Sequence, residues 1–225
     1  MHDTGRALTD LSFEDWVAHV FDHPGSGPEW HLDPAADYWD GPAAATVGYL
    51  TRLFEAPRPL LDGYSDAQLN RGFWYLLGSG GDEMHALMAA EVPVEARLAG
   101  VRAIGTLFEG LFAARCSAQL SHLDEAGAAP LNSACYMWWD LFPTWGAPKA
   151  PEQAALDGAL LPVMARILEI PHDACRESAL HGLGHWHLTY AAEVEAIVDG
   201  FLARAADLRP ELRDYARAAR SGCVN

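Results

Sequence analysis

Residues 174–205 read ACRESALHGLGHWHLTYAAEVEAIVDGFLARA, and both halves of this stretch repeat apolar residues with the period of an α-helix. The apolar positions are Cys175, Ala179, Leu183 and Trp186 in the first half and Val194, Ile197, Val198 and Phe201 in the second. Spacings of three and four residues place such side chains on one face of a helix. The stretch therefore predicts a helix that ends near a glycine, a short turn and a second amphipathic helix.

The same helical spacing runs along most of the chain, with the longest apolar stripe at about residues 93–115. Ser65 and Gln68 form the pattern of a capping box at a helix start. Pro162 falls inside a helical segment, where a proline should start or kink a helix. Alternating runs long enough for a sheet are absent, so the sequence predicts an all-α fold.

Similarity between segments of the chain extends this prediction. Nine-residue frames with matching apolar positions occur at 70–78, 98–106, 132–140 and 177–185. The pattern, clearest at 174–205, resembles the HEAT or HEAT-like helical repeat over about half of the chain. That resemblance implies helix pairs stacked into an irregular α–α superhelix. A compact helical bundle is the alternative, because the aromatic-rich N-terminal third departs from the pattern.

The composition favours one soluble domain over residues 1–225. Half of the 225 residues are apolar. The chain contains no run of 18 apolar residues, so the sequence predicts no membrane span. An irregular segment at about 22–42 gathers prolines and glycines around Trp30 and Trp39, and its aromatic rings need packing partners. The N-terminus shows no secretory signal, so we expect a cytoplasmic protein whose four widely spaced cysteines are reduced and mostly buried.

The charge balance restricts the class of partner. The chain has 31 Asp and Glu against 15 Lys and Arg, a formal net charge of −16. Such a charge disfavours nucleic acid and anionic lipid, and it suits a basic protein or peptide or a cationic small molecule. The sequence does not fix the oligomeric state.

Polar residues four positions apart line the flanks of the predicted apolar stripes. These flank positions are Asn132, Tyr136 and Asp140 in one frame, Glu177, His181 and His185 in the next, and Asn70 and Trp74 in the loosest frame. If the helices stack, the flanks join into one polar and aromatic strip. This strip is the candidate site.

Two kinds of chemistry are open to the histidines of the strip. Glu177, His181 and His185 occupy successive helical turns, so all three could hold one zinc or similar divalent ion. Without a metal, His181 or His185 could act as acid or base, with Asp140 or Glu177 as the orienting carboxylate. The plain alternative is a pair of histidines on a partly exposed helix face, hydrogen-bonded to Glu177 or to water.

The preferred hypothesis is a non-catalytic binding protein without a cofactor. Its concave acidic and aromatic groove, with Trp74 and Tyr136 beside Asp140 and Glu177, would hold a basic or cationic partner. The alternative is a hydrolase that uses Glu177, His181 and His185, with or without a metal. The sequence lacks a G-x-S-x-G elbow, a Walker loop and a dinucleotide fingerprint.

Overall fold

The computed structural model describes residues 5–79, 83–205 and 207–224, and it confirms the all-α prediction. The helices are α1 (Phe13–Phe21), α2 (Ala43–Glu55), α3 (Pro57–Leu61), α4 (Asp66–Trp74), α5 (Val94–Leu107), α6 (Ala113–Arg115), α7 (Asn132–Met137), α8 (Pro151–Leu168), α9 (Asp173–Arg204) and α10 (Pro210–Arg220). Short helical turns are η1 (Trp30–Leu32), η2 (Tyr75–Ser79), η3 (Glu83–Met88), η4 (Phe108–Phe112) and η5 (Ser121–Leu123). Two short strands, β1 (Ala7–Leu8) and β2 (Tyr38–Trp39), pair in parallel near the N-terminus.

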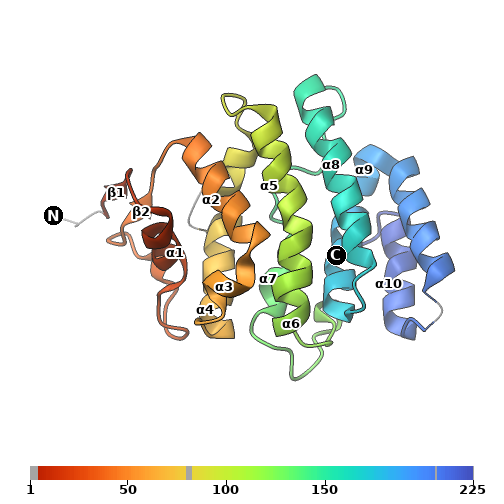
Figure 1. The fold of residues 1–225 in the computed structure, drawn as a ribbon. Helices are drawn as coiled ribbons and strands as arrows, with labels where there is room; N and C mark the ends of the chain where they lie inside the picture. Colours follow the sequence, from red (N-terminus) through yellow and green to blue (C-terminus); the bar gives the residue numbers. More distant parts are fainter. Residues whose placement is uncertain (1–4, 80–82, 206, 225) are drawn as a thin grey trace.

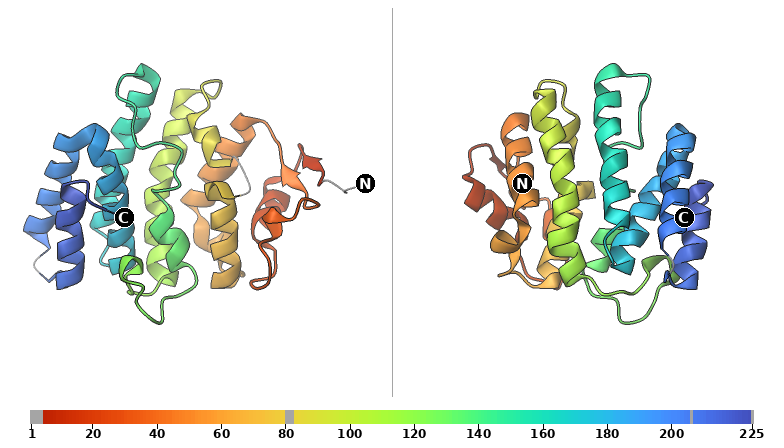
Figure 2. Two further views of the ribbon diagram at one scale, coloured as in Figure 1. Left: turned by 180° about the vertical axis from the view of Figure 1, so that it is seen from behind. Right: turned by 45° about the vertical axis from the view of Figure 1, so that its right-hand side comes forward.

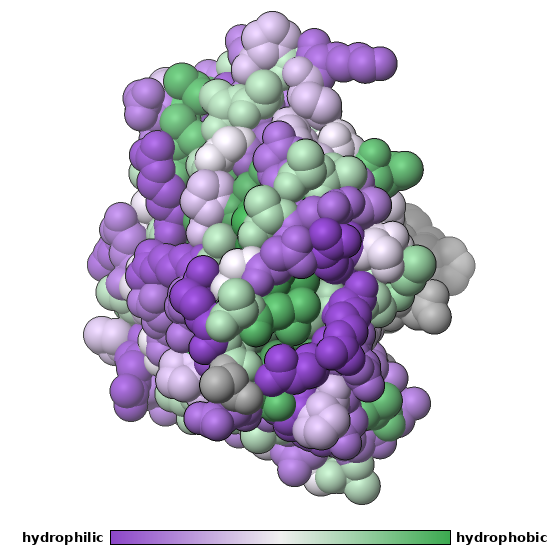
Figure 3. Space-filling model, turned by 90° about the vertical axis from the view of Figure 1, so that its right-hand side faces the viewer, coloured by the Kyte–Doolittle hydropathy of each residue, from purple (hydrophilic) through white to green (hydrophobic). Residues whose placement is uncertain are grey.

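The helices form two layers that advance along the molecule from the N-terminus to the C-terminus (Figures 1 and 2). Helices α2, α5 and α8 lie side by side in one layer. Helices α4 and α7 and the first half of α9 lie behind them, and α10 packs against α9 at the far end. The outer face at this C-terminal end is largely hydrophilic around a small apolar hollow (Figure 3).

Helix α9 is longer than the predicted 93–115 segment and contains a sharp reversal. It runs on through the glycines of the 177–185 frame, so the expected turn near a glycine is wrong. The break comes at Tyr190, whose φ of −130° and ψ of 50° are not helical. The chain turns back there, and the two halves of α9 run side by side (Figure 1). The predicted pair of helices therefore exists, with its turn displaced toward the C-terminus.

The capping box predicted at Ser65 is confirmed, whereas Pro162 does not start a helix. Ser65 accepts from the backbone N–H of Gln68, whose side chain accepts from the Ser65 N–H, as in a complete capping box. Pro162, in contrast, neither starts nor ends a helix, because α8 runs from residue 151 to 168 through it. A proline at 162 leaves only the carbonyl of Gly158 without its helical partner, and Gly158 is exposed to water.

The buried apolar side chains form one continuous core centred on aromatic rings. Trp138, which is fully buried, contacts the rings of Phe54, Phe73, Phe108 and Phe112. These rings come from both layers, so Trp138 joins the layers at the middle of the molecule. Within the ranges that the structure describes, no helix combines the length and apolar character that crossing a membrane needs.

The irregular segment at 22–42 is packed against the core, as its aromatic content predicts. The guanidinium of Arg71 donates hydrogen bonds to four backbone carbonyls of this segment, those of Pro24, Ser26, Gly27 and Pro28. The His23 and Trp30 rings stack at 3.8 Å. His19 lies beside Trp30 and Tyr75, and burial lowers its pKa to about 4, with His23 adding to the shift and Asp37 opposing it.

We predict that acid destabilises the protein partly through His19. The unfolded chain takes up a proton on this residue near pH 6.5, whereas the folded chain does so only near pH 4. Stability should therefore fall as the pH drops through this window, by at most about 1.4 kcal/mol per pH unit for one group. In urea unfolding at about pH 7 and about pH 4.5, His19→Gln should lose less stability than the wild type. Equal losses in the two proteins would contradict this assignment.

Candidate functional site

A close approach between α9 and the end of α7 brings the candidate residues together. A Cβ atom added at Gly182 would lie 2.5 Å from the Cβ of Trp139, a contact that no larger residue can make without movement. Gly182 therefore lets the chain after α7 lie directly on α9. As a result, Asp140 faces His181 and His185, which stand one helical turn apart on α9.

Three ligand atoms converge at this point. His185 Nε2 lies 3.1 Å from Asp140 Oδ1 and 3.2 Å from His181 Nε2. All three atoms lie within 4.8 Å of one another, which a single metal ion can span. Among the described residues, this is the group of His, Cys, Asp and Glu side chains with metal-binding spacing.

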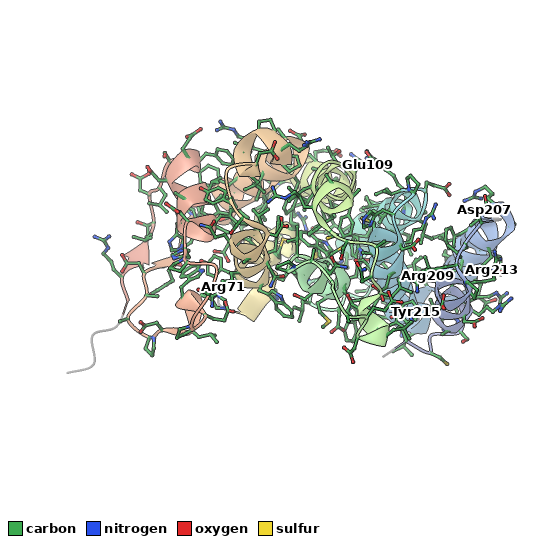
Figure 4. The ribbon with its side chains drawn as sticks, turned by 90° about the horizontal axis from the view of Figure 1, so that it is seen from below. Arg71, Glu109, Asp207, Arg209, Arg213 and Tyr215 are labelled. Carbon is green, nitrogen blue, oxygen red and sulfur yellow. The ribbon has the colours of Figure 1, made fainter. Side chains whose placement is uncertain are left out.

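The protonation states suit a cation at the same point. Burial lowers the pKa of His181 to about 4, and the neighbouring His185 and His122 add to the effect. The His181 ring is therefore neutral at pH 7. Its Nδ1 forms a 2.7 Å hydrogen bond with the hydroxyl of Tyr215, and its Nε2 lies 3.2 Å from His185 Nε2. When the Tyr215 hydroxyl accepts the hydrogen of Nδ1, the lone pair of Nε2 is available to a cation. Tyr215 lies on α10 (Figure 4).

Aromatic and phenolic groups surround the three converging side chains. The Tyr136 ring packs at 4.4 Å from the ring of His181, and its hydroxyl lies 3.2 Å from that of Tyr215. Burial raises the pKa values of both tyrosines, and the negative charges of Glu177 and Asp140 act in the same direction. Both phenols therefore keep their protons at neutral pH.

The group is open to solvent on one side only. His181 is 2% exposed, whereas the side chains of His185 and Asp140 are 22% and 26% exposed. Trp145 stacks on the His185 ring at 4.8 Å and remains 45% exposed. Leu188, on the same helix, is 91% exposed. The accessible edge thus combines a carboxylate, an imidazole and apolar surface.

Glu177 does not join this group, contrary to the predicted ligand set. Its carboxylate is fully buried and accepts hydrogen bonds from the backbone N–H groups of Ser121 and His122, each at 2.9 Å. His122 Nδ1 lies 2.6 Å from the same carboxylate, and the His122 ring stacks on Tyr215 at 4.0 Å. These contacts anchor the η5 turn, and Asp140 occupies the carboxylate position that was predicted for Glu177.

The other residues of the predicted strip separate in the structure. Asn132 is buried, and its side chain bonds to the Ser117 and Gln119 backbone. The Asn70 side-chain oxygen accepts from the Ser133 hydroxyl and the Ala134 backbone N–H, and the Trp74 indole N–H donates to the same Ser133 hydroxyl. Burial removes Asn132 and Glu177 from any surface that a partner can contact. Of the strip, Tyr136, Asp140, His181 and His185 remain together.

Sequence reasoning missed three contributors, namely Tyr215, Trp145 and His122. Each reaches the site through tertiary packing, from α10, from the 143–150 loop and from η5, and none shares a periodic pattern with α9. The sequence does contain a signal for Asp140 as a site residue, because Asp140 aligns with His185 when the frames 132–140 and 177–185 are superposed.

Comparisons with known proteins supply no family for this arrangement. No protein-family model matches the chain, and searches of curated proteins and of solved structures give no match. We therefore infer the function from the geometry of the site.

We predict that Glu177 acts as a structural anchor. Glu177→Ala leaves two buried backbone N–H groups without their acceptor, which should lower the free energy of unfolding by about 2 to 5 kcal/mol. Glu193→Ala, an exposed position on the same helix, should change it by less than about 0.5 kcal/mol. Chemical denaturation measures both values. Equal, small effects would show that Glu177 does not hold η5.

Proposed function

We propose that this protein is a metal-dependent hydrolase whose divalent ion is held by Asp140, His181 and His185. The observation that carries the proposal is the convergence of one carboxylate oxygen and two imidazole nitrogens within 4.8 Å, beside a solvent-accessible edge. Without a cation, a single hydrogen on His185 Nε2 can be donated to only one of its two close neighbours. A metal ion would satisfy all three ligand atoms at once.

The ligand set favours zinc or a similar first-row ion. Two imidazoles suit such metals, whereas calcium and magnesium prefer oxygen ligands. Structural zinc sites close with four protein ligands, and catalytic sites keep three and leave a position open. A bound divalent ion would supply Lewis-acid polarisation of a substrate carbonyl or of a water molecule.

The surrounding residues have separate roles in this proposal. With the metal on Nε2, His181 Nδ1–H would donate to the Tyr215 hydroxyl, and this hydrogen bond would orient the ring as outer-sphere partners of metal-binding histidines commonly do. Trp145 covers one face of the His185 ring and keeps that ring from rotating. The protonated phenol of Tyr136 stands next to His181, where it can donate a hydrogen bond to a substrate oxygen.

We further propose that the helices form a HEAT-like stack. Two features support this architecture, the side-by-side helices of the two layers and the reversal at Tyr190 that makes α9 part of two successive helix pairs.

Binding of a cationic partner is the second candidate function. Trp145 is exposed against the ring of His185, which pairs with the carboxylate of Asp140, and Leu188 is exposed further along α9. The chain has a net charge of −16. An aromatic face next to an acid suits a lysine- or arginine-rich peptide. Under this alternative, such a peptide binds metal-free protein, salt weakens the complex, and Trp145→Ala weakens it further.

We predict that the protein binds a single equivalent of zinc or cobalt(II). Calorimetry with zinc, and the visible absorption of a cobalt(II)-loaded sample, should detect it in protein purified without a histidine tag. His185→Ala and Asp140→Asn should each weaken binding by at least about 100-fold, because each removes a ligand. Tyr215→Phe, which removes the hydrogen bonds of the Tyr215 hydroxyl to His181 and to Tyr136, should weaken it by about 10- to 100-fold.

His187→Ala is the matched control, because His187 lies on the same helix and pairs with Glu195 outside the group. It should bind metal as the wild type does. Loaded protein should then hydrolyse members of a panel of esters, amides and phosphodiesters, and His185→Ala should not. The absence of metal binding would overturn the site, and binding without hydrolysis would overturn the enzyme assignment alone.

A further inference from the structure

Three of the four cysteines, which are far apart in the sequence, lie near one another at a second buried place in the fold. Cys116 follows α6, Cys135 lies within α7, and Cys175 lies in the first turn of α9. Their exposed fractions are 8%, 0% and 0%, and none forms a disulfide. The fourth, Cys223, is exposed near the C-terminus. The expected burial of the first three is thus observed, but their mutual contact was not predicted.

Hydrogen bonds connect Cys135 with the start of α9, and Cys116 with His172, the residue that precedes α9. The thiol of Cys135 donates to the carbonyl of Ala174 at 3.7 Å, which places it against the start of α9. His172 Nε2 lies 3.1 Å from the carbonyl of Cys116, so this nitrogen carries the ring hydrogen and donates it. The lone pair of a neutral imidazole is then on Nδ1.

His172 Nδ1 is buried and makes no hydrogen bond of regular geometry. The side chain of Cys175 interacts with the His172 ring and raises its pKa against the opposing effect of burial. A thiol beside an unoccupied imidazole nitrogen, with the other ring nitrogen held by a carbonyl, is the arrangement of an activated cysteine. The positive end of the α9 dipole adds to this effect, because Cys175 lies in the first helical turn.

The two neighbouring thiols differ in acidity. Interactions with the Cys135 thiol, with His172 and with Arg176 lower the pKa of Cys175 to about 6 against the opposing effect of burial. Burial raises the pKa of Cys135, and its contacts with Cys116 and Cys175 act in the same direction. Cys175 is therefore the more acidic of the two thiols, and Cys135 is the one that keeps its proton.

We propose that Cys175 and Cys135 form a thiol modification site that hydroperoxides oxidise to a disulfide. The Cys175 sulfur attacks one peroxide oxygen, so that an S–O bond forms, the O–O bond breaks, and the leaving oxygen takes a proton to become water or an alcohol. The Cys135 sulfur then attacks the resulting sulfenic acid, forming the S–S bond and releasing a second water. Two electrons pass from the two thiols to the peroxide.

The disulfide would join α7 to the first turn of α9. Helix α9 and the segment that directly follows α7 also carry the proposed metal-binding group. Ser178, one turn after Cys175, already donates to the Cys135 carbonyl. The modification site does not depend on the proposed hydrolase activity. It would exist whether or not Asp140, His181 and His185 bind a metal.

The test treats the metal-free folded protein with hydrogen peroxide and maps disulfides by mass spectrometry. We expect a Cys135–Cys175 disulfide in the wild type and in Cys223→Ser, the matched control that removes only the exposed thiol. In Cys135→Ser, dimedone should trap a sulfenic acid on Cys175. In Cys175→Ser, disulfide formation at Cys135 should slow by at least about tenfold, since the thiolate is lost.

Circular dichroism before treatment shows which variants are folded, and dimedone labelling of the wild type at short times gives a readout that needs no variant. Oxidation confined to Cys223 would overturn the proposal, because it would show that the buried thiols do not react. A Cys116–Cys135 disulfide would overturn the assignment of Cys175 as the attacking thiol.

Discussion

The site depends on the close contact between Gly182 of α9 and Trp139, which follows α7. Any side chain at 182 would occupy the space of the Trp139 Cβ, so glycine is required for α9 to lie directly on this segment. The neighbouring Gly184 makes a similar approach to Val224, where an added Cβ would lie 2.4 Å from a methyl group. Two glycines that lower intrinsic helix stability thus allow α9 to be covered closely on both sides.

Packing and polar chemistry support each other around this contact. Trp138 fills the aromatic core from the same segment that presents Asp140, so the core fixes the position of the carboxylate. On the other side, the Glu177 carboxylate holds His122 against Tyr215, and Tyr215 holds His181. The converging ligand atoms are therefore positioned by a continuous set of buried contacts, as a preorganised metal site requires.

Much of the fold could be predicted because helical periodicity is a local property. The stripes of 174–205 and the capping box at Ser65 appear in the structure as expected. The turn at Tyr190 could not be located, since the glycines of the 177–185 frame serve close packing and do not end the helix. Within the candidate site, His181, His185 and Asp140 came from spacing, but the choice between Asp140 and Glu177 depends on how α7 meets α9. Tyr215 comes from a separate helix and leaves no local signal.

The most direct test of the central claim is anomalous X-ray scattering at the zinc absorption edge, from crystals grown with stoichiometric zinc. We predict a single strong anomalous-difference peak about 2.0–2.2 Å from Asp140 Oδ1, His181 Nε2 and His185 Nε2. No peak at these atoms, or a peak at His172 and Cys175 in their place, would contradict it.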